Sequence, residues 1–165
     1  METRALDLAH GLTIVVRPLA NGDVQTVATV FDRLGDESRR RRFNAAKPCL
    51  TASDLEQLAR IDGTHHALVA HVVGDTRPAA IAQLVRTGRE TAEIAFAVAD
   101  EHQHRGIGSA LTGMLLDDAR AAGITEISAL ASGDNRAALA LIRRSACILE
   151  VRLEGPEQAI RAAIA

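Results

Sequence analysis

The chain has 165 residues, 47% of them hydrophobic, with a formal net charge of −2 at pH 7 and a pI near 6.3. The apolar fraction excludes a disordered tail, and the weakly acidic balance argues against a nucleic-acid-binding protein, which usually carries a basic surplus. The length suits one core, so we expect a single domain over residues 1–165, with no room for an attached nucleotide-sensing or synthetase domain.

The chain shows no membrane anchor or secretion signal. No apolar stretch is long enough to span a bilayer, and the N-terminal segment carries acidic residues without a long apolar core. Cys49 and Cys147 do not make a disulfide framework, and we expect Cys147 to be a buried small hydrophobic residue. We therefore expect a cytoplasmic protein without a membrane partner.

The first predicted elements are one strand and three helices, at 11–19, 24–34, 35–43 and 51–60. The strand is rich in β-branched residues, and the first helix has apolar residues at helical spacing. In the last helix, Ser53 followed by Glu56 predicts a capping box.

The middle of the chain predicts three strands joined by short turns, at 65–73, 78–86 and 90–99. Such short loops favour antiparallel hairpins. A helix, a strand, a helix capped near Asp134, a strand and a short terminal helix follow, at 105–122, 124–131, 133–146, 147–154 and 155–165. This order predicts an α+β domain, and the lack of regular βαβα alternation argues against a Rossmann fold.

The turn from strand to helix at 103–108 has the pattern Q-x-x-G-x-G. Glycine lets another group approach the backbone closely, and a helix start has amides without partners. Amides converging from His104 to Ala110 could therefore hold a pyrophosphate. The turn matches neither a Walker loop nor the three-glycine dinucleotide pattern.

The segment Phe96–Leu111, FAVADEHQHRGIGSAL, resembles the acyl-CoA-binding motif of the GNAT superfamily of N-acetyltransferases. The resemblance extends to AEIAFAV before it and DNRAALALIRRSA after it, and to the order of elements over 11–153. It implies a mixed, mostly antiparallel sheet flanked by helices, with a splayed central strand pair. More narrowly, IVVRPLANGD and RLGDESRRRRF resemble the acetyltransferase domain of bacterial protein lysine acetyltransferases.

The resemblance also implies a ligand and its contacts. Acetyl-CoA would be the co-substrate, without a metal, and the acceptor would be an amine, either a protein lysine or a small molecule. Strand backbone would pair with pantetheine, loop amides would bind the pyrophosphate, and one later residue would lie near the cofactor arm. The implied cofactor-binding residues are Phe96, Ala97, Val98, Gln103, His104, Arg105, Gly106, Ile107, Gly108, Ser109 and Asn135.

Acetyl transfer to an amine needs a base, because an alkyl ammonium has a pKa of about 10.4. Glu93 is our candidate, as a carboxylate in an otherwise apolar strand that matches the strand glutamate used by many family members, directly or through a water. The alternative is an outward-facing Glu on a half-solvated strand. A β-bulge could change the direction in which it points.

The chain departs from the family pattern in its later part. The chain has no Tyr, and Ile142 occupies the place of the Tyr that often reprotonates the thiolate. Ser145, Cys147 or a water could replace it, or the thiolate could leave unaided. The final hairpin strand of the family is expected to be replaced by residues 156–165.

Some alternatives stay open at this point. Arg39–Arg42 could bind the 3′-phosphate of CoA or an acidic acceptor protein, or form a solvated helix face. The chain could also be a non-catalytic acyl-CoA-binding module that keeps the phosphate loop and dispenses with the base. An unrelated phosphate-binding domain is disfavoured because the resemblance is distributed along the chain.

Overall fold

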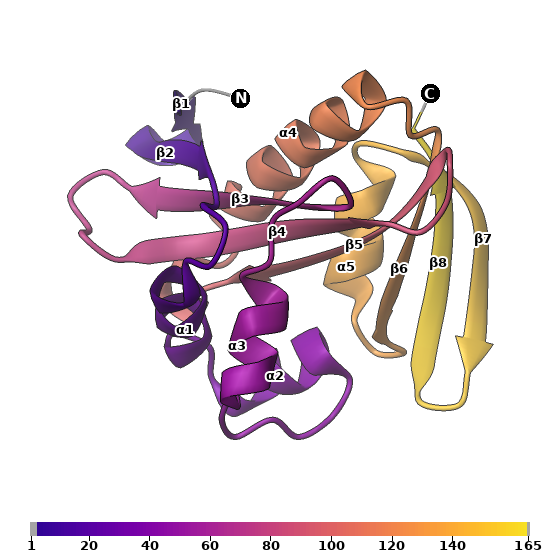
Figure 1. Ribbon diagram of the computed structural model, residues 1–165, viewed down its shortest axis with the longest axis horizontal. Coiled ribbons are helices and arrows are strands. Elements are labelled where there is room, and N and C mark those ends of the chain that lie inside the picture. The colour runs from indigo at the N-terminus through magenta and orange to yellow at the C-terminus, as the bar shows by residue number, and fades with distance from the viewer. Residues whose placement is uncertain (1–2, 165) are drawn as a thin grey trace.

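The computed structural model describes residues 3–164 and contains one eight-stranded sheet with the order β1-β2-β3-β4-β5-β6-β8-β7 (Figure 1). The strands are β1 (Arg4–Leu8), β2 (Leu12–Pro18), β3 (His65–Val72), β4 (Pro78–Arg86), β5 (Thr91–Val98), β6 (Glu126–Ser132), β7 (Cys147–Glu154) and β8 (Glu157–Ala163). The helices are α1 (Val24–Asp32), α2 (Asp36–Phe43), α3 (Ala52–Leu58), α4 (Ile107–Ala121) and α5 (Arg136–Arg143), with short 3-10 turns η1 (Ala9–Gly11) and η2 (Asp100–His102).

Only β5 and β6 pair in parallel, and the other neighbouring strands are antiparallel. The predicted α+β class and the mostly antiparallel sheet are therefore confirmed. Strand β1 was not predicted; it pairs along β2 at one edge of the sheet.

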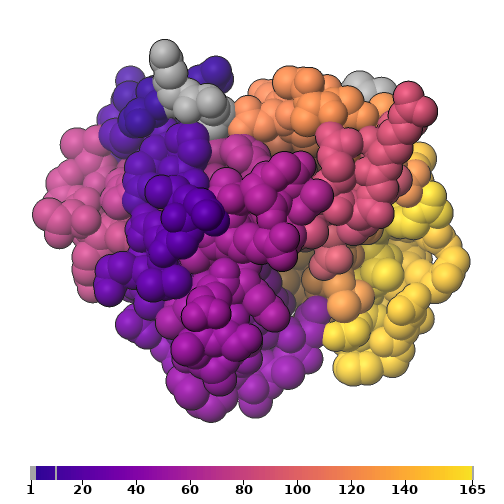
Figure 2. Space-filling model, viewed as in Figure 1, coloured from indigo at the N-terminus to yellow at the C-terminus, as the bar shows by residue number. Residues whose placement is uncertain are grey.

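Helices cover both faces of the sheet. Leu68 and Ala70 of β3 belong to the core beneath α4 and α5, whereas Ala67 and Val69 belong to the core beneath α1 and α3. This alternation follows from the two-residue period of a strand, and it explains why β3 is apolar on both sides. Figure 2 shows the side with α1, α2 and α3, where the surface is hollowed between these helices and the β7–β8 hairpin.

The central strands separate after a short paired stretch. Thr91–Glu93 of β5 pair with Glu126–Ser128 of β6, and beyond them β5 pairs only with β4 while β6 continues along β8. The predicted splayed pair is thus confirmed. The splay leaves peptide groups of Ile94–Val98 without a strand partner on the β6 side.

The predicted helix at 155–165 is wrong where the structure describes it, because Glu157–Ala163 form strand β8 between β6 and β7. The final hairpin strand is therefore present rather than replaced. Alanines in this segment favour a helix locally, but its alternate side chains Gln158, Ile160 and Ala162 are buried in the sheet. Gly155 adopts φ +63° in the turn that reverses the chain.

Several smaller expectations were also wrong. The capping box of α3 uses Thr51 and Asp54 rather than Ser53 and Glu56. The N-cap of α5 is Asn135 rather than the predicted Asp134, and Cys147 is exposed rather than buried.

Among residues 3–164, no helix combines the length and the apolar character needed to cross a membrane.

We expect Ile160→Ala to lower the free energy of unfolding by about 2–5 kcal/mol, because the side chain is 1% exposed and its loss leaves a core cavity. Leu153→Ala, in the same hairpin but 71% exposed, should change it by no more than about 0.5 kcal/mol. Urea denaturation of the three proteins measures both effects. Equally small changes would contradict the placement of Ile160 in the sheet.

Candidate functional site

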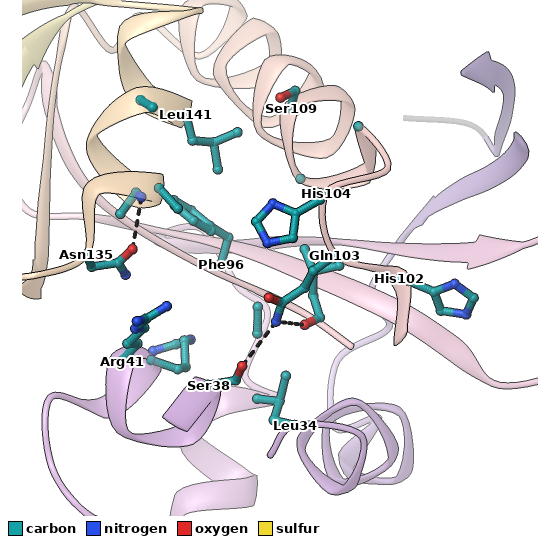
Figure 3. A pocket seen from close by; sticks show the side chains of 18 of the residues that line it. Leu34, Ser38, Arg41, Phe96, His102, Gln103, His104, Ser109, Asn135 and Leu141 are labelled. Carbon is teal, nitrogen blue, oxygen red and sulfur yellow. Dashed lines mark hydrogen bonds between the residues drawn. The ribbon is translucent and has the colours of Figure 1, made fainter. Parts of the chain in front are cut away.

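A cavity of about 430 Å³ lies between the end of β5, the turn before α4, helix α2 and helix α5 (Figure 3). Most of the predicted cofactor-binding residues line it, namely Phe96, Ala97, Val98, Gln103, His104, Gly106, Gly108, Ser109 and Asn135. The side chains of the other two lie elsewhere. Ile107 is buried in the core, and exposed Arg105 places its Nη1 3.3 Å from Nδ1 of His102.

The turn before α4 is built from left-handed backbone. His104 has φ +58° and Gly106 has φ +87°. Such a conformation suits glycine but is uncommon for other residues, and strained positions concentrate at functional sites. Gly106 is the N-cap of α4, and no side chain caps the helix. The first amides of α4 are therefore left for a ligand or for water.

Gly108 in the first turn of α4 has room for a side chain. A Cβ atom there would lie 3.5 Å from Val98 and 3.7 Å from Leu141, which is ordinary contact. Packing of the protein itself therefore does not require glycine at this position. The missing side chain instead leaves backbone open towards the cavity.

Gln103 ties the turn to its surroundings. Its Nε2 donates to the carbonyl oxygen of Val98, to Oγ of Ser38 and to Oδ1 of Asp100, each at 3.1 Å. The side chain thereby links the end of β5 to α2 across one wall of the cavity (Figure 3). Asn135 acts similarly on another wall, because its Oδ1 accepts from the amide of Ala138 and caps α5.

The charged groups of this cavity have one sign. Arg41, Arg42 and Arg144 line it together with two histidines, and no carboxylate is among its described lining residues. An anion is therefore favoured there. The sequence indicated Arg41 and Arg42 only as part of a basic run, and it did not indicate Arg144, whose position depends on how α5 packs.

Glu93 lines a second cavity, also of about 430 Å³, beside Arg42 near the end of α2. It is exposed and is the sole carboxylate among the described residues that line this cavity. The pairing of β4 with β5 is unbroken from Ala80 and Val98 to Arg86 and Ala92, so no bulge redirects Glu93. Strand alternation therefore places it on the face opposite Ile94, which packs in the core beneath α4.

Arg42 borders both cavities. Burial lowers the pKa of its guanidinium to about 10, and the negative charge of Glu93 acts in the opposite direction. Arg42 therefore stays protonated at neutral pH.

A buried cation holds the start of the turn before α4 in place. Arg33, 8% exposed, donates to Oε1 of Glu101 at 2.8 Å, to the carbonyl of Pro78 at 2.9 Å and to Oδ2 of Asp75 at 2.6 Å. His102 Nε2 lies 3.0 Å from its Nη2. The network joins α1, the β3–β4 turn and η2.

The residues considered as proton donors to the leaving thiolate lie away from the first cavity. Ile142 is fully buried in the core, and neither Ser145 nor Cys147 is among the lining residues. Within residues 3–164, no three His, Cys, Asp or Glu side chains are placed to share a metal ion.

Comparison with known proteins gives matches over most of the chain. Residues 31–146 match the sequence profile of the acetyltransferase (GNAT) family. The chain is 36% identical over 126 residues to acetyltransferase Pat of Mycolicibacterium smegmatis, covering 74% of this chain and 37% of Pat. It is 31% identical over 138 residues to acetyltransferase PA5475 of Pseudomonas aeruginosa, covering 79% of this chain and 72% of that protein.

A solved structure extends the likeness to the fold. The crystal structure of the GNAT domain of S. lividans PAT superposes with a TM-score of 0.87 at 26% identity, covering 98% of this chain and 96% of that one. This chain therefore spans a domain-sized part of Pat and most of the length of PA5475.

We expect Asp75→Asn to lower the free energy of unfolding by more than about 1 kcal/mol at pH 7, because Arg33 loses a charged partner. The backbone N–H of Arg77, then Arg33 and His102, hold the pKa of Asp75 well below its ordinary value, against an opposing effect of burial. A depressed pKa stabilises the fold above the unfolded pKa, about 3.9, and this contribution is lost as the pH falls.

The difference between parent and Asp75→Asn should therefore be constant from about pH 5 to 7 and shrink below about pH 4. Urea denaturation at several pH values measures it. Asp117→Asn, which breaks an exposed ion pair with Arg120, should cost no more than about 0.5 kcal/mol. A difference that grew on acidification would contradict the assignment.

Proposed function

Because the chain belongs to the acetyltransferase (GNAT) family, whose members are N-acetyltransferases that use acetyl-CoA, we propose that it transfers the acetyl group of acetyl-CoA to a primary amine. The acceptor is a protein lysine or a small amine. The observation that carries this proposal is that the unpaired edge of β5 and the uncapped start of α4 border one cavity whose described lining residues include no carboxylate.

The residues present fit a diphosphate-bearing ligand. Amides of 104–109 would hold the pyrophosphate, and charge-assisted hydrogen bonds of this kind contribute about 1.5–3 kcal/mol each. The backbone of Phe96–Val98 would form hydrogen bonds with the amides of the pantetheine arm of CoA. This arm would take the place of a neighbouring strand on the β6 side of β5. Arg41 and Arg144 add positive charge to the same cavity.

A thioester supplies an acyl group on a leaving group whose thiol has a pKa of about 8.5. In the proposed reaction the neutral amine attacks the thioester carbonyl directly in a ternary complex. The new C–N bond forms, the C–S bond breaks, and Glu93 accepts the proton that the amine loses, directly or through a water. With no Tyr in the chain, the thiolate leaves unaided and takes its proton from water.

The two cavities support this division of roles. The first contains the anion-binding groups and the second contains Glu93, and Arg42 borders both. A base near the acceptor and away from the phosphates avoids repulsion between like charges.

We expect Gly108→Ala to weaken CoA binding by at least about tenfold, equivalent to about 1.4 kcal/mol, because the added methyl group occupies backbone surface that the ligand must approach. Stability should not fall, since the Cβ makes ordinary contacts and Ala favours a helix. Gly113→Ala, in the same helix with nothing within 4 Å of the added Cβ, is the control. Titration calorimetry with CoA measures the effect, and unchanged affinity for Gly108→Ala would argue against this placement of the pyrophosphate.

We expect Glu93→Gln to lower kcat by about 100-fold or more, the range typical of a lost general base, while the affinity for acetyl-CoA is retained. Thiol release with a panel of amines measures kcat. Glu90→Gln is the control, because Glu90 precedes β5 and lines neither cavity. Unchanged turnover in Glu93→Gln would show that another group acts as the base. A parent protein that binds CoA but acetylates no amine would favour a non-catalytic binding module.

A further inference from the structure

The second cavity differs from the first in its charges, because it contains one carboxylate and one guanidinium that form no ion pair with the residues that the structure describes. Glu93 is its sole carboxylate among the described lining residues, and Arg42 contributes a protonated guanidinium. Arg60 and His65 also line it, but both are engaged by Asp62, at 2.5 Å and 3.0 Å.

Arg42 differs from the two arginines that precede it in α2. Arg40 and Arg41 form ion pairs with Glu37 at 2.8 and 2.9 Å. Arg42 forms no ion pair with any residue that the structure describes. Its Nη2 donates to Oε1 of Gln83, and its guanidinium stacks 5.0 Å from the ring centre of Phe43.

These contacts orient the guanidinium without using all of its donors. Nε2 of Gln83 donates to the carbonyl of Leu58 at 2.7 Å, so the amide oxygen of Gln83 is directed at Arg42. A guanidinium has five N–H donors in a fixed fork. One neutral amide oxygen satisfies only a part of this fork, so the half-buried guanidinium keeps free donors. Glu93 acts on it electrostatically without forming an ion pair.

An acceptor with both charges would complement this cavity. We propose that the second cavity is the acceptor site and that Arg42 binds a carboxylate on the amine substrate, so that the acceptor is a small amino acid rather than a protein lysine. This inference rests on the proposed acetyltransferase function. The carboxylate forms hydrogen bonds with the guanidinium fork, a geometry that arginine matches well, while the amine faces Glu93.

A purely cationic acceptor would fit this cavity less well. An alkylammonium group without an anion would add a second positive charge beside Arg42, and Glu93 is the one carboxylate among the described lining residues to compensate both. The acetyl group would reach the amine from the first cavity, which Arg42 also borders.

The test is a panel of α-, β- and ω-amino acids, each beside its carboxamide, together with a lysine peptide blocked at both ends. Acetyl-CoA is the donor and thiol release is measured. We expect kcat/KM to be at least about tenfold higher for at least one amino acid than for its carboxamide and for the peptide, which corresponds to about 1.4 kcal/mol.

Arg42→Gln should remove this preference, because it should raise KM for the amino acid at least about tenfold more than it raises KM for acetyl-CoA. Arg42→Lys, which keeps the charge but loses the fork, should retain part of it. Arg40→Gln is the matched control on the same helix, because Arg40 lines neither cavity. If Arg42→Gln does not fold, the preference of the parent and its reduction in Arg42→Lys decide the matter.

Three results would overturn the inference. Equal kcat/KM for amino acids and carboxamides, or a preference for the peptide, would leave the acetyltransferase function intact but would contradict the binding of a substrate carboxylate by Arg42. A higher KM for acetyl-CoA alone in Arg42→Gln would assign Arg42 to the cofactor site. A parent that binds CoA but acetylates no member of the panel would remove the proposed function as well.

Discussion

The separation of β5 from β6 is the constraint on which the rest of the site depends. A sheet interior normally pairs every peptide group, and an unpaired group buried away from water is costly. Here the pairing stops after Glu93 and Ser128, so the following peptide groups of β5 need another partner. The same strand leads directly into the turn before α4, so unpaired strand edge and unpaired helix amides meet in one place. An extended ligand with amides at one end and phosphates at the other suits both.

The distribution of carboxylates divides the two cavities. The first has none among its described lining residues, while the second has Glu93 alone. Other acids near these cavities are engaged in structure, as Glu37 is with Arg40 and Arg41. A free carboxylate in the first cavity would repel phosphates, and several in the second would neutralise Arg42. The carboxylate therefore lies in one cavity and most of the free positive charge in the other.

Polar contacts hold the turn before α4 in place. Left-handed backbone at His104 is costly unless its surroundings hold it. Gln103 bonds to the end of β5 and to α2, and Arg33 fixes η2 through Glu101 and His102. These contacts pre-form the turn, so less conformational entropy is lost when a ligand binds. Protonation of Asp75 at low pH should weaken this network of Arg33 and therefore the fold.

Local chemistry in the sequence was enough to predict the glycine-containing turn before α4, the meander before it and the presence of an acid in an apolar strand. Left-handed glycines, helix starts and strand alternation involve residues close together in the chain, so they can be predicted from it. Tertiary structure decided what depends on distant partners. The alanine-rich segment 157–163 is a strand because β6 and β7 flank it, against its local helix propensity. Arg39–Arg42 look equivalent in the sequence, yet the structure pairs the middle two with Glu37 and places Arg42 between two cavities. Their roles differ because a helix presents each side chain to a different neighbour, and those neighbours are brought together only by the fold.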